Sequence, residues 1–266
     1  MRDSEFRELV WQVGGRLYRE MPWREDPSPY KVWVSELMLQ QTQVSRVIPK
    51  FEAFMQRFPD ITSLSESSLA DVLTLWSGLG YNRRAKYLWQ AALEVKLRFD
   101  SELPRTQKEL MSLPGIGPNT AAAILNYAYE IATPFVETNI RTVYFHHFFH
   151  DRTDISDKEL LRVVERTMDH EHPREFFWAL MDYGTHLKAT VGGRIDQSRH
   201  YKKQSPLSGS PREMRGRIIR VLTARSLTLD DLKRSVQADA RFHPALASLQ
   251  REGMVELHAG QWRLRA

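Results

Sequence analysis

The chain has 266 residues, a formal net charge of +5 and 42% hydrophobic residues, which favours a folded protein with two or three packing units over a disordered one. It has no cysteine, which excludes disulfide bonds, a catalytic thiolate and an iron–sulfur cluster held by cysteines. No apolar run is long enough to cross a bilayer, so we expect a cytoplasmic protein, nucleoid-associated if its source is prokaryotic, with no membrane partner.

The first two hundred residues carry repeated helix signals and few strand signals, so we expect this part of the chain to be almost entirely helical. A helix is predicted to begin at Ser28-Pro29, because proline suits the first position of a helix. Thr42 is predicted to cap the next helix, and two more helices are expected over residues 66–76 and 83–99.

Two later segments have the spacing of a capping box, in which a hydroxyl and a carboxylate three residues apart each bind a backbone amide at the helix start. Thr106 with Glu109 is the first pair, and Ser156 with Glu159 is the second. From residue 191 to 211 the sequence changes to glycine, serine, arginine, lysine and proline, which predicts an extended basic linker.

The sequence after this linker predicts a separate small module. Helices are expected over residues 212–223, 228–236 and 242–252, and the alternating apolar residues of 254–264 predict a short hairpin. Three helices and a terminal hairpin form a winged-helix-like module. Such a module either inserts its third helix into a DNA groove or binds another protein, and the sequence favours neither.

The segment Leu113-Pro114-Gly115-Ile116-Gly117 predicts a tight hairpin between two helices. Its glycines leave the loop amides uncovered by a Cβ, and Pro118 begins the second helix, whose positive end adds to an anion site. A DNA phosphate fits such a site. Glycine content alone favours an ordinary turn between helices, so the neighbouring motifs must decide between the two interpretations.

Five other segments accompany the hairpin in a fixed order. They are Met21-Pro22-Trp23-Arg24, Glu36 with Leu37–Gln43, Gly78-Leu79-Gly80-Tyr81, Phe135–Asn139 and Leu180–Gly184. Together they resemble the helix-hairpin-helix (HhH-GPD) DNA glycosylase superfamily, in particular its adenine glycosylase (MutY-type) branch, from Met21 to Leu187. Because several separate motifs agree in order and spacing, the resemblance is strong although each motif alone is weak.

The resemblance implies a mainly α fold in which two helical domains clasp DNA, followed by a small winged-helix-like α+β module. Residues 1–27 and 134–205 would form one helical domain, residues 28–133 the six-helix-type domain with the hairpin, and residues 206–266 the module. It also implies that the target base is flipped out of the duplex, because an enzyme cannot reach the base inside the stack.

Hydrolysis of the bond between a sugar and its base needs an acid for the leaving group and a carboxylate that stabilises positive charge on the sugar. By resemblance Glu36 is the acid and Glu137 is the stabilising carboxylate. One interpretation of Glu36 is a glutamate on the helix surface, but its apolar neighbours support a buried acid with a raised pKa at least as well. The family normally has aspartate at the position of Glu137, so one extra methylene leaves open whether the chemistry is retained.

The resemblance assigns the remaining site residues to two groups. The positions of the base pocket match Trp23, Arg24, Asn119 and Asp182. The DNA-binding positions match Gln40, Gln41, Tyr81, Asn82, Leu113, Gly115, Ile116, Gly117, Thr120 and Asn139. The two glutamines match residues that enter the duplex when a base is extruded. Asn82 replaces an aromatic wedge of adenine glycosylases and is more similar to the endonuclease III pattern.

Asn119 stands where bifunctional members carry a lysine that attacks the sugar, and asparagine cannot form the Schiff base. The resemblance therefore implies base removal without strand cleavage. Most relatives continue with four cysteines that hold a [4Fe–4S] cluster, whereas Lys188 stands at the first of these positions and no cysteine follows. We expect no cluster and no metal. The basic segment that follows either contacts phosphate in place of the cluster or is a solvated linker. Its cations are Arg194, Arg199, Lys202 and Lys203.

These residues predict a monofunctional DNA glycosylase of base excision repair that removes adenine opposite guanine or 8-oxoguanine. Its partner would be double-stranded DNA with a mismatch or damaged base, and we expect a monomer that needs no cofactor. Two alternatives stay open. One is a glycosylase for thymine, uracil or another damaged base on the same fold, and the other is an inactive DNA-binding protein, which the substitution at Glu137 favours.

Overall fold

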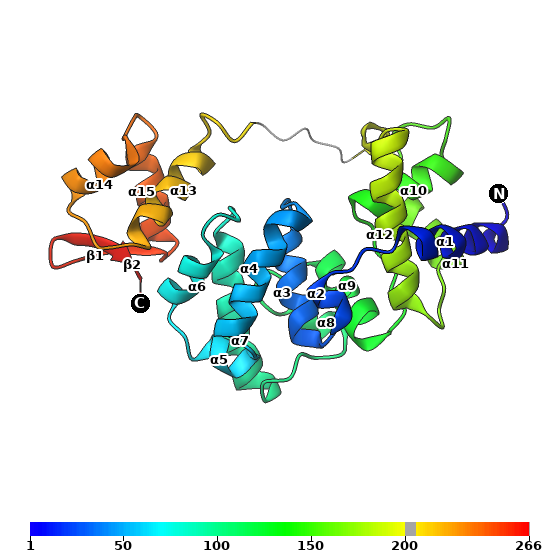
Figure 1. The fold of residues 1–266 in the computed structure, drawn as a ribbon, viewed down its shortest axis with the longest axis horizontal. Helices are drawn as coiled ribbons and strands as arrows, with labels where there is room; N and C mark the ends of the chain where they lie inside the picture. Colours follow the sequence, from blue (N-terminus) through cyan, green and yellow to red (C-terminus); the bar gives the residue numbers. More distant parts are fainter. Residues whose placement is uncertain (200–205, 266) are drawn as a thin grey trace. The chain divides into compact units, whose positions relative to one another are not determined.

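A computed structural model of the chain describes residues 1–199 and 206–265 (Figure 1). Lys202 and Lys203 of the predicted basic segment lie outside the described residues. Within both described ranges, no helix is long and apolar enough to cross a membrane. The internal contacts of the chain divide it into two compact units, which are described one at a time.

The first unit is built on the long helix α12, which packs against α1, α9 and α10. The elements of this unit are α1 (Asp3–Leu17), α2 (Pro22–Glu25), α3 (Pro29–Leu39) as far as Glu36, α8 (Gln107–Met111), α9 (Pro118–Tyr129), α10 (Thr138–Phe148), α11 (Asp157–Thr167), α12 (Pro173–Thr190) and the 3₁₀ helix η1 (Ile195–Gln197). Gly14 of α1 permits a close crossing with α12, because a Cβ there would lie 2.3 Å from the Cβ of Ala179. Phe6 adds ring contacts with Tyr144 and Phe148 of α10.

The second unit is centred on α7, which packs against α5 and α6. Its elements are the end of α3, α4 (Val44–Arg57), α5 (Ile61–Ser65), α6 (Leu69–Trp76), α7 (Arg83–Phe99), α13 (Pro211–Leu222), α14 (Leu229–Val236), α15 (Phe242–Arg251), β1 (Val255–His258) and β2 (Gln261–Leu264). Fully buried aromatic side chains fill its helical part, with Phe54 in ring contact with Phe58 and Trp76.

The C-terminal part of the second unit has the predicted three helices and hairpin (Figure 1). Helix α13 packs against α14 and α15, and β1 pairs antiparallel with β2 from Val255↔Leu264 to His258↔Gln261. Leu227 and Trp262 exchange two backbone hydrogen bonds of 2.9 and 2.7 Å, which tie the segment before α14 to the hairpin. The winged-helix-like prediction is therefore confirmed.

Two predicted helix starts are wrong. Helix α4 begins after Gln43, which makes no side-chain cap, and the hydroxyl of Thr42 instead accepts a hydrogen bond from Arg84 at 3.3 Å. The helix predicted over residues 66–76 begins only at Leu69, where the hydroxyl of Ser68 accepts the first capping bond. At α4 the hydroxyl that could cap the helix binds Arg84 instead, and at α6 the serine two residues after Glu66 provides the cap.

The two predicted capping boxes are half formed. The hydroxyls of Thr106 and Ser156 each accept the backbone amide three residues later, at 3.3 Å. The glutamates do not return the bond to a backbone amide, because Glu109 accepts from the hydroxyl of Thr106 at 2.6 Å and Glu159 pairs with Arg152 at 2.6 Å.

The contact-based units group the sequence differently from the expected domains. Helices α8 and α9 were expected in the middle domain and belong to the first unit, whereas the C-terminal module belongs to the second unit with α4–α7. The expected division into residues 1–27 with 134–205, 28–133 and 206–266 stays a prediction.

The hairpin between α8 and α9 uses its two glycines differently. Gly115 has a φ of +78°, and a Cβ there would lie 2.7 Å from the Cβ of Tyr87. Gly117 is the N-cap of α9 with a φ of −88°, and a Cβ there would meet open space. The side chains of Leu113 and Ile116 are buried, so the loop presents its backbone rather than these side chains.

Substitution Gly115→Ala is expected to destabilise the protein by about 1 to 3 kcal/mol, because it forces an L-residue into the left-handed region and crowds Tyr87. Gly117→Ala is the matched control and should change the free energy of unfolding by much less. Urea unfolding of the two variants beside the wild type measures both values. Equal stability of Gly115→Ala and Gly117→Ala would contradict the geometry of the turn.

Candidate active site

Glu137 is the N-cap of α10. Its Oε1 accepts hydrogen bonds from the backbone amides of Asn139 and Ile140 at 2.5 and 2.9 Å, and its Oε2 has a longer contact of 3.5 Å with the side-chain amide of Asn139. Shorter side chains usually cap helices, so the extra methylene of glutamate has been accommodated without loss of the cap. The carboxylate is held at the positive end of the helix dipole, which favours its ionised form.

Gly184 of α12 fixes the position of this cap from the other side. A Cβ at Gly184 would lie 2.3 Å from the carbonyl oxygen of Asn139 and 2.7 Å from its Cβ. These distances are too short for any side chain, so the backbone of α12 contacts the first residues of α10 directly. The place of Glu137 thus depends on a close contact between two helices.

Glu36 lies on α3, directly after the buried residues Val34 and Ser35, and is itself only partly exposed. Burial, followed by the negative charge of Glu137, raises the pKa of Glu36 to about 8, although the positive charge of Arg24 opposes this rise. Glu36 therefore keeps its proton at neutral pH. The effect of one carboxylate on the other also means that the two groups interact.

Glu137 faces opposing influences on its pKa. Burial has the larger effect and raises the pKa of Glu137 above its ordinary value, whereas the backbone amides of Ile140 and Asn139 and the positive charge of Lys188 offset part of this rise. The amides and Lys188 favour the ionised form of Glu137, and the charge of Glu137 in turn disfavours ionisation of Glu36, so we assign the proton of the pair to Glu36. Lys188 thus contributes positive charge to the site.

A buried ion pair lies beside the two carboxyl groups. Arg24 donates to both oxygens of Asp182, at 2.7 and 3.1 Å, and Arg19 adds a bond of 2.6 Å to the same carboxylate. The guanidinium of Arg24 also lies over the ring of Trp178, 5.2 Å from its centroid. Trp23, next to Arg24 on α2, is 5% exposed. The carboxylate of Asp182 therefore holds Arg24 in place.

Asn119 and Tyr127 both lie on α9, eight residues apart, which places them on the same side of the helix. The side-chain amide of Asn119 donates to the carbonyl oxygen of Val136 at 2.7 Å, directly before Glu137. Tyr127 is buried, and burial together with the charges of Glu36 and Glu137 raises its pKa well above the ordinary value. The sequence analysis missed Tyr127, although its helical spacing from Asn119 was visible.

Arg84 is a second residue that the sequence analysis missed. It is buried in the second unit and donates to the carbonyl oxygens of Leu37, Met38 and Gln40 at 2.6, 3.0 and 2.6 Å. Its other terminal nitrogen donates to the carbonyl oxygens of two loop residues, at 3.3 and 3.1 Å. These residues, Leu79 and Gly80, belong to the segment Gly78-Leu79-Gly80, which we call the glycine loop. Burial lowers the pKa of Arg84 to about 10. One guanidinium therefore holds the end of α3 and the glycine loop together.

Four predicted DNA-binding residues of the second unit belong to the two segments that Arg84 joins or follow directly after them. Gln40 and Gln41 are exposed at the end of α3, and Tyr81 and Asn82 follow the glycine loop. Gln41 and Tyr81 have φ values of +56° and +49°, which are rare for residues with a side chain. Such backbone strain persists only where the surroundings enforce it, and it clusters at functional sites.

The predicted site residues fall into both units. Those of the first unit are Trp23, Arg24, Glu36, Ile116, Gly117, Asn119, Thr120, Glu137, Asn139 and Asp182. Those of the second unit are Gln40, Gln41, Tyr81, Asn82, Leu113 and Gly115. All of the proposed catalytic and base-pocket residues thus belong to one unit. Asn139, predicted to bind DNA, has its side-chain amide near Glu137 and Met181.

The start of the predicted linker is an ordered part of the first unit, which corrects the prediction for residues 191–199. The hydroxyl of Thr142 donates to the carbonyl oxygen of Gly193 at 3.0 Å, and Arg199 binds the carboxylate of Asp154 at 2.8 and 2.7 Å. These bonds hold Gly193 against α10 and Arg199 against the segment before α11.

The residues present at this place do not fit an iron–sulfur cluster. The chain has no cysteine, and Lys188 and the arginines that follow carry positive charge rather than thiolates. Across the described parts of the chain, no group of three or more histidine, aspartate or glutamate residues could hold a metal ion.

The chain matches the family model of the "HhH-GPD superfamily base excision DNA repair protein" over residues 34–167, which include Glu36, the hairpin and Glu137. The fold is also that of solved members of this class. A thermostable thymine-DNA glycosylase structure has a TM-score of 0.65 with 22% identity and covers 72% of this chain and 90% of its own. A trapped endonuclease III–DNA covalent intermediate has a TM-score of 0.57 with 18% identity, covering 80% and 94%.

Curated relatives narrow this class. The adenine DNA glycosylase of Mycobacterium tuberculosis (strain H37Rv) is 33% identical over 242 residues, which cover 83% of this chain and 79% of the relative. That of Buchnera aphidicola subsp. Baizongia pistaciae is 38% identical over 167 residues, covering 62% of this chain and 48% of the relative. The chain spans about half the length of the Buchnera relatives. It belongs to the HhH-GPD superfamily and, within it, to the adenine DNA glycosylase family, as the motifs predicted.

Glu36→Gln is expected to stabilise the folded protein, and more strongly as the pH rises. In the unfolded chain Glu36 ionises near pH 4.5, whereas in the folded protein it keeps its proton up to about pH 8. Between these values the folded state binds the extra proton, so the wild type loses stability as the pH rises and glutamine does not. The gain should be about 3 kcal/mol larger at pH 8 than at pH 5.

Urea unfolding at these two pH values measures the difference. Glu165→Gln, at an exposed glutamate of α11, is the matched control and should change the free energy of unfolding by the same amount at pH 5 and at pH 8. A gain for Glu36→Gln that does not depend on pH would refute the raised pKa.

Proposed function

We propose that this chain is a monofunctional DNA glycosylase that removes adenine mispaired with guanine or 8-oxoguanine. The observation that carries the proposal is the pair of interacting carboxyl groups, in which burial and the charge of Glu137 keep the proton on Glu36 at neutral pH, while backbone amides bind the carboxylate of Glu137. Glycosidic hydrolysis needs one group in each of these states. The similarity to adenine DNA glycosylases over most of a mycobacterial relative supports adenine as the base.

The proposed reaction has two steps. Glu36 gives its proton to the purine ring of the flipped nucleotide, the bond between the sugar and the base breaks, and the bonding electron pair leaves with the base. The sugar is left as an oxocarbenium ion, which the carboxylate of Glu137 stabilises. A water then attacks the sugar carbon and gives its proton to Glu137, so that the products are free adenine and an abasic site.

The two oxygens of Glu137 have different tasks in this mechanism. Oε1 accepts two backbone amides and holds the side chain in place, whereas Oε2 has a longer contact of 3.5 Å with the side-chain amide of Asn139. Oε2 is therefore the oxygen available to the sugar and the water. Because the cap keeps the extra methylene of Glu137 in a defined position, we favour an active enzyme over an inactive DNA-binding protein.

The base pocket is formed by side chains around the buried ion pair. Asp182 orients Arg24, and Trp23 is buried next to Arg24 on α2. The ring of Tyr127 is close enough to the two carboxyl groups for their charges to raise its pKa. Arg24 lowers the pKa of Glu36, so its position also determines how acidic the proton donor is. Asn119 contacts the backbone before Glu137 and lies on the sugar side of the proposed pocket.

Base removal is proposed to leave the DNA strand intact. Strand cleavage by bifunctional members depends on an amine that attacks the sugar, and the amide of Asn119 cannot do so. The substrate would be duplex DNA that reaches the site through a flipped nucleotide, in the compartment that contains the chromosome. We propose a monomer that needs no cofactor for this chemistry.

The test is release of adenine from duplexes that contain adenine opposite guanine or 8-oxoguanine. Wild-type protein is expected to give a product that breaks with alkali and stays intact without it. Glu137→Gln should lose at least about a hundredfold in the rate and keep its affinity for the duplex, because it loses the stabilising charge. A panel with thymine, uracil and other damaged bases opposite guanine identifies the base.

Glu165→Gln is the control for this experiment, since the residue is exposed on α11 and outside the site. Strands that stay intact after alkali with every adenine mismatch would overturn adenine as the substrate. Wild type and Glu137→Gln that behave alike in every assay would favour the inactive DNA-binding protein.

The value of kcat/KM for base release should fall above about pH 8. The proton on Glu36 is lost through this range, and a general acid works only in its protonated form, so the rate should drop about tenfold for each further pH unit. Glu36→Gln should have a much lower single-turnover rate than the wild type, and this rate should not decline above pH 8. A wild-type rate that is constant well above pH 8 would exclude Glu36 as the acid.

A further inference from the structure

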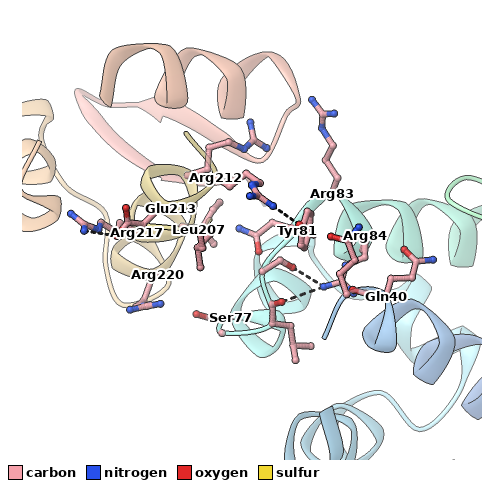
Figure 2. Close-up of a pocket in the computed structure, with 18 of the residues that line it drawn as sticks. Gln40, Ser77, Tyr81, Arg83, Arg84, Leu207, Arg212, Glu213, Arg217 and Arg220 are labelled. Carbon is pink, nitrogen blue, oxygen red and sulfur yellow. Dashed lines mark hydrogen bonds and ion pairs between the residues drawn. The ribbon is translucent and has the colours of Figure 1, made fainter. Parts of the chain in front are cut away.

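The second unit contains a cavity of about 980 Å³ with an unusual charge (Figure 2). Among the described residues, its lining includes seven arginines but only one carboxylate, that of Glu213. Four of the arginines, among them Arg212 and Arg220, come from α13 of the C-terminal module. A site with this excess of guanidinium groups suits a ligand with several phosphates, because arginine binds phosphate through paired donors.

Helix α13 presents a stripe of three residues that are four positions apart. Arg212, Gly216 and Arg220 share one side of the helix by this spacing, and all three line the cavity. A Cβ at Gly216 would meet no atom within 4 Å, so packing does not require glycine here. Glycine inside a helix lowers stability relative to alanine, and its use is to let a ligand backbone approach closely.

The helix is connected to the rest of the unit by a shared carboxylate. Glu252, at the end of α15, accepts two hydrogen bonds from Arg83 of α7 at 2.9 and 2.8 Å, and two from Arg215 of α13 at 2.8 and 2.7 Å. Lys86 of α7 also donates to the backbone carbonyl oxygen of Glu252. These bonds hold α13 beside the glycine loop and α7.

The same cavity is continuous with residues predicted to bind DNA. Gln40, Gln41, Tyr81 and Asn82 line it together with α13. Figure 2 shows Arg212 directed toward Tyr81, and its guanidinium donates to the Tyr81 hydroxyl and lies 5.6 Å from the ring centroid. A duplex that contacts the glutamines and Tyr81 would therefore run along α13.

We propose that α13 is a second DNA-binding element, which holds the phosphate backbone of the duplex against the stripe of Arg212, Gly216 and Arg220. This proposal rests on the proposed function, because it assumes that the duplex bound by α13 is the substrate of the active site in the first unit. The C-terminal module then binds DNA through its first helix, and the C-terminal end of α15, the helix that winged-helix modules place in a groove, contacts α7 through Glu252.

The experiment measures the affinity of the full chain for a short fluorescein-labelled duplex over a range of salt concentrations. Arg220→Ala is the first variant, since Arg220 is exposed and forms no ion pair with another described residue. It should weaken binding by about threefold to tenfold and reduce the slope of log affinity against log salt by about one, the value for one phosphate contact. Arg225→Ala, exposed on the same module but outside the cavity, should leave both values unchanged.

Gly216 provides a matched pair of variants. Gly216→Ala adds a methyl that meets no protein atom, so it should fold at least as well as the wild type, and it should weaken binding by much less than a charged side chain because it displaces the ligand backbone only slightly. Gly216→Glu adds a chain and a negative charge to the stripe and should weaken binding by about tenfold or more. Thermal unfolding of both variants shows whether the helix is intact.

Base release by the same proteins keeps the two proposals apart. Under single-turnover conditions with saturating protein, Arg220→Ala should release adenine at the wild-type rate, and at low protein concentration it should be slower. Wild-type affinity and salt slope in both Arg220→Ala and Gly216→Glu would overturn the role of α13, even if the wild type releases adenine. A reduced slope in Arg251→Ala on α15, with none in Arg220→Ala, would assign DNA contact to the other helix and overturn it as well.

Discussion

The carboxylate of Glu137 accepts the first amides of α10, and the charge held there acts on Glu36. Two carboxyl groups that interact in a partly buried place cannot both be ionised without a large cost. Their surroundings decide which one keeps the proton: Glu36 has apolar neighbours, whereas Glu137 has amides and the ammonium of Lys188. Three helices supply these surroundings: α3 carries Glu36, α10 provides the amides that bind Glu137, and α12 carries Lys188.

Much of the fold could be predicted because its signals are local. Proline at the start of α3, the hydroxyls of Thr228 and Ser156 and the alternation in the terminal hairpin all act within a few residues of their own position. Thr42 shows where this reasoning ends. Its hydroxyl could cap a helix, but it accepts a hydrogen bond from Arg84, forty-two residues later, instead. Contacts between distant segments are not encoded in spacing.

The candidate site could be predicted from its motifs as a set of residues, but not as a set of contacts. Glu36 and Glu137 stand out because the chemistry needs two carboxyl groups, and Asp182 because it follows a motif. The sequence could not show that Asp182 binds Arg24 through both oxygens, since this pairing joins residues 158 positions apart. For the same reason Arg84 was missed: an arginine in a polar segment looks like a surface residue until the carbonyl groups around it are known.

Arg84 also has a consequence for the energy of binding. It binds carbonyl oxygens at the end of α3 and in the glycine loop, so the glutamines and Tyr81 are fixed relative to one another before any DNA arrives. Loss of conformational freedom in loops usually reduces the affinity of an interface. Here that loss has already occurred during folding. The two segments are preorganised, and the binding energy of the duplex remains available for the work of extruding a base.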